Sequence, residues 1–374
     1  MPEPRFLQIH TLTPYTAALL NRDDSGLAKR LPYGGALRTR VSSQCLKRHW
    51  RTAEDPHALH AIDGADAAHR SRELVTRLVL GDLRGRTPEV ATAIEPEFQM
   101  AVYGDKGTSK SARQTLLFGE REIAWLRSEA GRLADEAAGD PAVAKAKAAD
   151  WRKGFKANIK AMRDGAALPG GLTAALFGRM VTSDTAANIT APVHVAHAFT
   201  VHGEESESDY FTAVDDLSDD EPGADTIQET ELTSGLFYGY VVVDLPGLMK
   251  NLGPAAPDLA GPVLHNLVHL IAEVSPGAKL GSTAPYGRAS LMLLEAGDRQ
   301  PRSLAEAFRE PCPPETGEAI RRLSAHLDAL DAAYATGEER RFLSVRNEPI
   351  DGGAERGTLA ELAAWAGELP GRLS

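Results

Sequence analysis

The chain has 374 residues, of which 43% are hydrophobic, and a formal net charge of -11 at pH 7. This length allows two domains or one core with large insertions, and the hydrophobic content is sufficient for a substantial buried core. The segment MPEPRFLQIH lacks the apolar stretch of a secretion signal, and no apolar run reaches the length of a membrane span, so we expect a cytoplasmic protein with no membrane partner. The isolated Cys45 and Cys312 exclude a disulfide framework and a thiolate metal cluster.

The charges are segregated along the chain. Between Arg179 and Lys250 there is no Lys or Arg but there are fourteen acidic residues, twelve of them from Glu204 to Glu231. When these fourteen acids are set aside from the net charge of -11, the remaining residues sum to +3. This asymmetry suits a protein that places an acidic arm on a basic surface of another copy and binds a polyanion elsewhere, whereas a solvated acidic loop is the alternative.

Near the N-terminus, residues 4–14 predict a short first strand that ends at Pro14, followed by a Gly- and Pro-containing loop from Asn21 to Ala36. No acidic residue occurs from Ser25 to Ala53, where seven cations are found: Lys29, Arg30, Arg38, Arg40, Lys47, Arg48 and Arg51. Arg38 and Arg40 alternate as on one face of an extended segment, and the serines that follow predict a capped helix start. Serine hydroxyls, helix N–H groups and cations together favour a phosphate site, although a solvated basic helix face would have the same pattern.

Residues 55 to 177 have helical periodicity, which predicts an inserted helical subdomain. Residues 193–203 and 234–245 predict two strands separated by the acidic arm. A helix over residues 259–274, a loop from Ser275 to Arg288, a last strand over residues 290–297 and a tail of two or three helices complete the chain. This pattern predicts an α+β fold that is compatible with a ferredoxin-like core.

Several residue patterns in the sequence partly match catalytic or metal-binding motifs. Gly104 to Ser111 lacks the spacing of a phosphate-binding P-loop, so nucleotide hydrolysis has no support. His265 and His269 have the i, i+4 spacing of a zinc pair but lack the following Glu of a metalloprotease, and we interpret them as helix-core histidines. His57, with His60 and Asp63, forms a weak candidate for adventitious metal binding, so no cofactor is expected.

The chain resembles CasC, the multi-copy backbone subunit of the type I-E CRISPR surveillance complex (Cascade), a member of the RAMP superfamily. The resemblance starts in the basic stretch and continues in the same order and at about the same spacing over most of the chain. The motifs that carry it are LNRDD, YGG, RVSSQCLKR, GRMVTS, HVAHAFTVH, DYFTAVDDL, SGLFYGYVVVDL and EVSPGAK.

This resemblance implies an α+β fold with a modified RRM or ferredoxin-like palm, an inserted helical fingers subdomain and a β-hairpin thumb. The expected segments are palm 1–54, fingers 55–177, palm 178–203, thumb 204–233, palm 234–300 and a C-terminal helical segment 301–374 that packs on the palm.

The resemblance also implies RNA contacts, mostly with phosphates and therefore independent of sequence. In the opening stretch the expected contacts are Arg22, Lys29, Arg38, Arg40, Ser42, Ser43, Gln44, Lys47, Arg48 and Arg51. Met180 and Ile227 match apolar wedges that splay a nucleotide, Thr182 and Ser183 flank the first wedge, and the glycine-bearing loop provides Lys279 and Arg288.

We therefore expect a non-catalytic scaffold for guide RNA (crRNA) that oligomerises head-to-tail along the RNA and presents it for pairing with a target DNA strand in antiviral defence. Its expected partners are crRNA, target DNA, further copies of itself and the large, small, crRNA-processing and 5'-end Cascade subunits. The alternative is a RAMP-type metal-dependent endoribonuclease that uses Asp215 and Asp216. A third interpretation, independent of the resemblance, is an anion-binding α+β metabolic enzyme.

Overall fold

The computed structural model describes residues 3–181, 184–213 and 226–373. The chain divides into two compact units. A sheet unit comprises Met1–Leu59, His194–Leu245 and Gly261–Ser374, and a helical unit comprises His60–Val193 and Pro246–Ala260. No helix in the described ranges is long and apolar enough to span a membrane.

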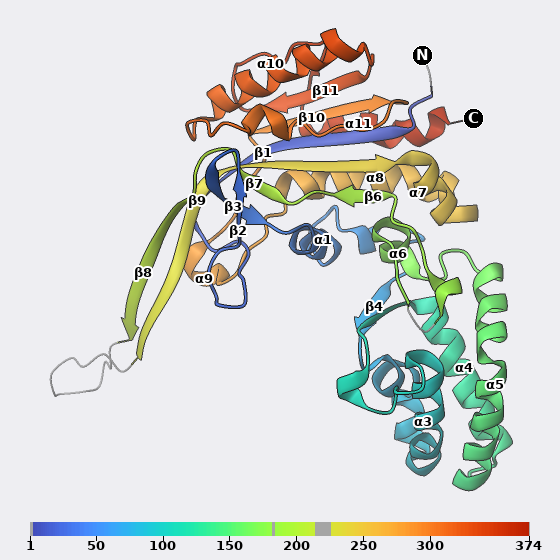
Figure 1. The fold of residues 1–374 in the computed structure, drawn as a ribbon. Helices are drawn as coiled ribbons and strands as arrows, with labels where there is room; N and C mark the ends of the chain where they lie inside the picture. The colour runs from blue at the N-terminus through green and yellow to red at the C-terminus, as the bar shows by residue number, and fades with distance from the viewer. Residues whose placement is uncertain (1–2, 182–183, 214–225, 374) are drawn as a thin grey trace, which may run out of the picture. The chain divides into compact units, whose positions relative to one another are not determined.

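The strands and helices follow the chain in an order that mixes both types (Figure 1). The strands are β1 (Phe6–Ala18), β2 (Arg30–Tyr33), β3 (Ala36–Val41), β4 (Ala68–Ser71), β5 (Leu116–Gly119), β6 (Val193–Val195), β7 (Ala198–Thr200), β8 (Glu205–Ala213), β9 (Thr226–Asp244), β10 (Leu291–Gly297), β11 (Glu339–Ser344) and β12 (Glu355–Arg356). The helices are α1 (Ser43–Arg51), α2 (Gly81–Arg86), α3 (Pro88–Tyr103), α4 (Glu120–Glu136), α5 (Pro141–Gly165), α6 (Gly171–Phe177), α7 (Leu245–Leu252), α8 (Ala256–Glu273), α9 (Leu280–Thr283), α10 (Thr316–Tyr334) and α11 (Leu359–Glu368).

The sheet unit is built on a ten-stranded sheet in the order β12-β11-β10-β1-β9-β7-β3-β2, with β6 and β8 also paired to β9. Its central strands β10, β1, β9 and β7 are antiparallel neighbours. With α1 following β1 and α8 following β9, this is the order of a ferredoxin-like βαββαβ fold. The predicted α+β class is therefore confirmed.

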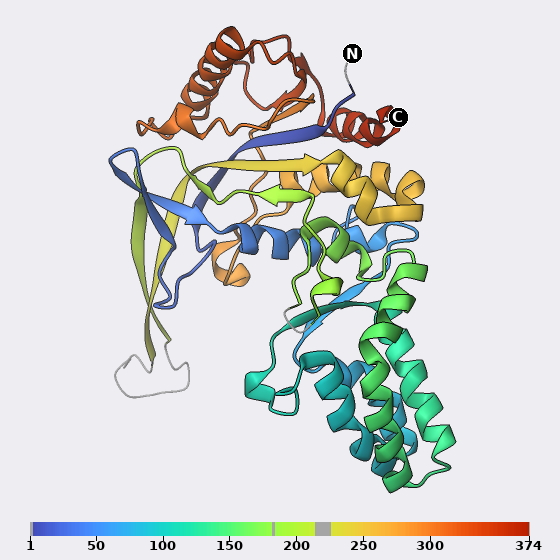
Figure 2. The same cartoon turned by 45° about the vertical axis from the view of Figure 1, so that its right-hand side comes forward.

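Helices cover both faces of the sheet (Figures 1 and 2). On one face, Leu12, Tyr238 and Leu293 pack with Phe308 and with Leu323 of α10. On the other face, residues of β1 and β9 meet Leu46 and Trp50 of α1 and Ile271 of α8. The sheet is therefore buried on both sides at its centre, which explains the nearly continuous burial of the first half of β1.

Strand β1 is longer than the predicted short strand and continues past Pro14 to Ala18. The pairing with β10 ends at Leu12, whereas the pairing with β9 includes Pro14 and shifts register between Tyr15 and Ala18. Proline is tolerated there because the strand has a partner on only one side. The predicted all-helical tail is also wrong in part, since β11 lies in it and pairs with β10.

The helical unit has its own core, in which α3, α4 and α5 run side by side (Figure 2). Phe98 of α3 and Trp151 of α5 stack with their ring centroids 4.1 Å apart. Asp140 caps α5 by accepting hydrogen bonds from the N–H groups of Ala142 and Val143. The unit extends to Val193, beyond the end of the predicted fingers at residue 177.

Candidate nucleic-acid interface

Asn21 connects the three segments that carry the basic residues of the opening stretch. Its main-chain oxygen accepts the N–H of Lys29 at 3.0 Å, and its side-chain oxygen accepts the N–H of Ser42 at 2.9 Å. The N–H of Arg40 donates in turn to the Lys29 carbonyl at 2.8 Å. The segment before β2, strand β3 and the start of α1 are thus fixed together through Asn21, a role that its loop-like sequence context did not indicate.

The predicted helix cap is confirmed, but the cap occupies part of the predicted anion site. Ser42 is the N-cap of α1 and its hydroxyl oxygen accepts the N–H of Cys45 at 3.3 Å. The N–H of Ser43 donates to Nδ1 of His197 at 3.0 Å. Both serines are buried, whereas Gln44 is exposed. Two of the helix-start N–H groups therefore have protein partners, and the side-chain cations become the main attraction for an anion.

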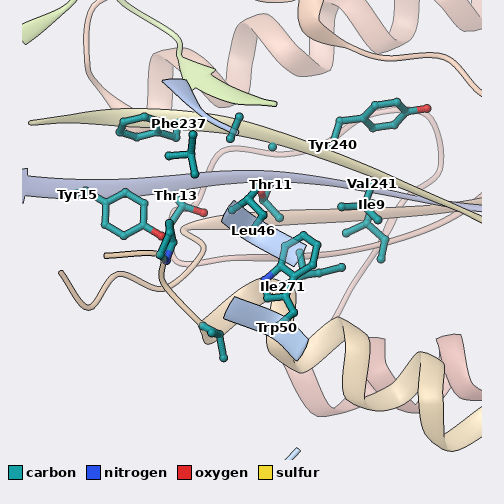
Figure 3. Close-up of a pocket in the computed structure, with 15 residues that line it drawn as sticks. Ile9, Thr11, Thr13, Tyr15, Leu46, Trp50, Phe237, Tyr240, Val241 and Ile271 are labelled. Atoms are coloured by element: carbon teal, nitrogen blue, oxygen red, sulfur yellow. The ribbon is translucent and has the colours of Figure 1, made fainter. Parts of the chain in front are cut away.

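Packing of α1 against the sheet orients its basic side chains. Figure 3 shows Leu46 and Trp50, one turn apart on α1, facing β1 across a cavity of about 40 Å³. This volume is close to that of one water molecule and far below that of a small-molecule site. Because the apolar side of the helix faces the sheet, Lys47, Arg48 and Arg51 occupy its other sides, with Arg48 exposed and the other two half-buried.

The cations of this region act on two neighbouring titratable groups. Partial desolvation lowers the pKa of His197, and the positive charges of Arg40, Lys47 and Lys29 lower it further. Burial raises the pKa of the Cys45 thiol, against the opposing effect of Arg48 and Lys29. Together the cations that act on these two groups are Lys29 before β2, Arg40 of β3, and Lys47 and Arg48 in the second half of α1, and we call these four the α1 basic patch. His197 lies in this patch and was not among the sequence candidates.

Arg38 is excluded from this surface, contrary to expectation. Its side chain is completely buried. The guanidinium donates to the main-chain oxygens of Tyr33 at 3.2 Å, Thr200 at 3.0 Å, Phe308 at 3.0 Å and Arg309 at 3.2 Å. Arg38 therefore joins the β2–β3 turn to β7 and to the segment before α10, and it is not available to a phosphate.

Two further arginines of the opening stretch differ in exposure and in their partners. Arg22 is exposed and forms an isolated antiparallel bridge with Ala28. Arg30 of β2 pairs with Glu204 at 2.5 Å and with Glu231. Two of the twelve acids of the arm are therefore neutralised within the chain, at the base of the hairpin.

Lys279 and Arg288 lie at the two ends of the glycine-bearing loop and have different surroundings. The ammonium of Lys279 donates to the Thr230 hydroxyl of β9 at 2.5 Å, and the preceding Ala278 N–H donates to Leu19 O at 2.9 Å. The loop is thereby attached to the end of β1, beside Asn21. Arg288, whose side chain is 82% exposed, instead pairs with Glu273 of α8 at 3.2 Å.

In the helical unit, Met180 is 78% exposed although its neighbours Arg179 and Val181 are buried. Arg179 donates to Glu122 at 2.6 Å and to the Ala187 carbonyl at 2.9 Å. Glu122, itself fully buried, also pairs with Arg163 at 2.5 Å. This network holds the residue before Met180, and the N–H of Val181 after it donates to the side-chain oxygen of Asn188 at 2.7 Å, so the thioether projects from a fixed segment. The adjacent Thr182 and Ser183 lie outside the described residues.

The acidic arm forms an antiparallel hairpin of β8 and the first part of β9, from the Glu205–Ser234 pair to the Ala213–Thr226 pair. Ile227 is paired with Thr212 near the far end of this hairpin. Side chains from Glu205 to Tyr210 are exposed on both faces of the ribbon. Asp215 and Asp216, the residues of the nuclease alternative, lie outside the described residues.

Comparison with known proteins gives matches over nearly the whole chain. Residues 7–366 match the family model Cas_CT1975, described as CT1975-like protein. A chain of a solved structure titled "CRISPR RNA-guided surveillance complex, pre-nicking" is 27% identical with a TM-score of 0.79, covering 96% of this chain and 100% of that one. A chain of a second "CRISPR RNA-guided surveillance complex" is 21% identical with a TM-score of 0.58, covering 96% and 99%, and supports the fold. No curated protein matches.

Proposed function

Since the chain belongs to the CT1975-like protein family and is of the CasC type, we propose that it is the crRNA-binding backbone subunit of a CRISPR surveillance complex, of type I-E as the sequence motifs indicate. The observation that carries the proposal is the α1 basic patch, a cluster of side-chain cations in a chain of net charge -11. The structural likeness to a surveillance-complex chain over its full length supports it.

The patch suits a guide of any sequence. Its cations are carried by the second half of α1, by β3 and by the segment before β2, and Asn21 connects these segments through the helix start and Lys29. Positive side chains recognise phosphates without reading bases, so specificity is left to pairing between crRNA and the target DNA strand. Arg22, Arg51, Gln44, Lys279 and Arg288 extend the proposed contact surface. The two buried serines contribute by fixing the helix start.

The acidic hairpin is proposed to bind a basic surface of the next copy. The β8 strand of the hairpin exposes its side chains from Glu205 to Tyr210 and so buries little apolar surface of its own, which is typical of a segment that is completed by a partner. A contact between unlike surfaces on identical chains extends head-to-tail instead of closing. This gives an oligomer along the crRNA, to which the other Cascade subunits bind.

Met180 and Ile227 are proposed to act as wedges on the RNA, with Thr182 and Ser183 beside the first. A thioether that is 78% exposed on a firmly held segment is suited to contact an unstacked base. In this mechanism the protein binds, segments and orients RNA, and no bond is broken. The scaffold is therefore proposed to be non-catalytic.

The proposal is tested by purifying a tagged copy from its own cells, extracting the bound nucleic acid and measuring particle mass by light scattering. We expect one discrete RNA protected by several copies. Lys47→Ala should retain less RNA than the wild type. The control is Arg299→Ala, which should retain as much as the wild type, because Arg299 is an exposed cation just beyond the end of β10 that pairs with the start of β1. RNA-free wild-type particles, or equal retention by both variants, would contradict the proposal. Metal-dependent cleavage of the RNA would favour the nuclease.

A further inference from the structure

Three histidines from distant parts of the sequence meet in the sheet unit. His57 lies on the turn after α1, and His265 and His269 are one turn apart on α8. One ring nitrogen of each lies within 4.8 Å of the other two. The rings of His57 and His269 stack with centroids 3.6 Å apart, and those of His265 and His269 are 5.0 Å apart. The sequence had grouped His57 with His60 and Asp63 instead.

Each of these imidazoles has an oxygen next to its Nδ1 atom. The Nδ1 of His57 is 3.3 Å from Asp55 Oδ1, and the Nδ1 of His269 is 3.4 Å from Glu273 Oε2. The Nδ1 of His265 is 3.0 Å from the side-chain oxygen of Asn266. Histidines that bind metals commonly donate their second N–H to a carboxylate or carbonyl oxygen. With the proton on Nδ1, the lone pair of each Nε2 remains for an ion.

The cluster is accessible from solvent. An open pocket of about 540 Å³, lined by Asp55, His57 and Glu273, adjoins the cluster. A hydrated ion can therefore reach the histidines from solvent.

We propose that His57, His265 and His269 bind one Zn²⁺ ion through their Nε2 atoms, with water as the fourth ligand. Tetrahedral zinc with Zn–N bonds of 2.0–2.1 Å brings its nitrogens to about 3.3 Å from one another. The ring nitrogens must therefore approach one another. The parallel stack of His57 on His269 must also open, because an ion lies in the plane of each imidazole that binds it. His57 can rotate because it lies on a turn rather than a helix. The ion would connect the end of the α1 segment to α8 and stabilise the sheet unit.

The site is tested on the full chain without a polyhistidine tag, with Zn²⁺ alone, by competition with a chromophoric chelator and by thermal unfolding. We expect one equivalent of zinc and a higher Tm. His57→Ala and His269→Ala should each weaken binding more than about tenfold, as should Glu273→Gln, since loss of a supporting contact costs about 10- to 100-fold in affinity. The matched control is His60→Ala, which removes an exposed histidine three residues from His57 and should bind zinc as the wild type does.

Cobalt substitution makes the test independent of how any variant folds. Wild-type protein with Co²⁺ should give the intense visible absorption of a tetrahedral site. A pale octahedral spectrum, a stoichiometry well below one, or equal affinity in wild type and His57→Ala would overturn the proposal. Failure of RNA binding would leave it unaffected, because no RNA is present in the assay.

Discussion

Replacing Arg38 with alanine should destabilise the sheet unit without removing a phosphate contact. The fully buried guanidinium donates to four main-chain oxygens from three separate segments of the chain. A hydrogen bond to a charged group contributes about 1.5–3 kcal/mol, so four such bonds would sum to at least about 6 kcal/mol if they were additive. Single substitutions rarely exceed about 4–5 kcal/mol, so we expect a loss of about 4 kcal/mol in the free energy of unfolding.

The assay pairs urea unfolding with RNA binding at several salt concentrations. Arg38→Ala should shift the unfolding midpoint while the folded protein keeps the wild-type dependence of log K on log salt. Lys47→Ala should keep the midpoint and reduce that slope by about 0.7, the value for one phosphate contact on a single strand. Arg38→Lys should also be destabilising, because an ammonium cannot reach carbonyls arranged for a planar guanidinium. If Arg38→Ala kept the wild-type unfolding midpoint and reduced the slope of log K against log salt, the structural role assigned to Arg38 would be wrong.

Glu295→Ala should cost about 3–5 kcal/mol in urea unfolding, since it leaves Arg302 and Arg340 without their buried carboxylate. Despite its burial, hydrogen bonds from His10 and Arg302 hold the pKa of Glu295 well below its usual value, so its contribution should be complete above about pH 4.3 and lost as the pH falls further. Parallel acid-unfolding profiles for wild type and variant would contradict this. Glu122→Ala should destabilise the helical unit by a similar amount, measured by loss of helical circular dichroism. Met180→Ala should change the free energy of unfolding by less than about 0.5 kcal/mol, because the side chain is exposed. In chemical probing of bound RNA it should abolish the reactivity of one unstacked nucleotide, and unchanged reactivity would contradict the wedge role of Met180.

Local signals in the sequence identified the capped start of α1 and the basic stretch. Ser42 caps α1 because a serine followed by an amphipathic run encodes that geometry within a few residues. Alternation placed Arg38 and Arg40 on one side of β3, but it carries no information on what covers that side. The carbonyls of Thr200 and Phe308 that bury Arg38 are more than 150 residues away in sequence.

Long-range contacts also explain the other differences between the predicted and the observed structure. Pro14 is a strand terminator by local rules, yet β1 continues because its pairing with β9 extends past Pro14, where β10 is no longer paired to β1. The predicted fingers ended at residue 177, whereas the guanidinium of Arg179 reaches Glu122 and keeps the following segment with the helical unit. His57 could not be grouped with His265 from sequence, since only the tertiary fold brings them together.

Strand β9 has nineteen residues and belongs to two structures at once. Its first part forms the acidic hairpin with β8, and its later part is paired with β1 from Thr233 to Asp244. A force applied along the hairpin by a neighbouring copy would therefore load the β1–β9 ladder in shear, where many hydrogen bonds resist together. In a head-to-tail oligomer of such chains, tension applied to the hairpin would therefore be transmitted to the hydrogen bonds between β1 and β9 at the centre of each sheet.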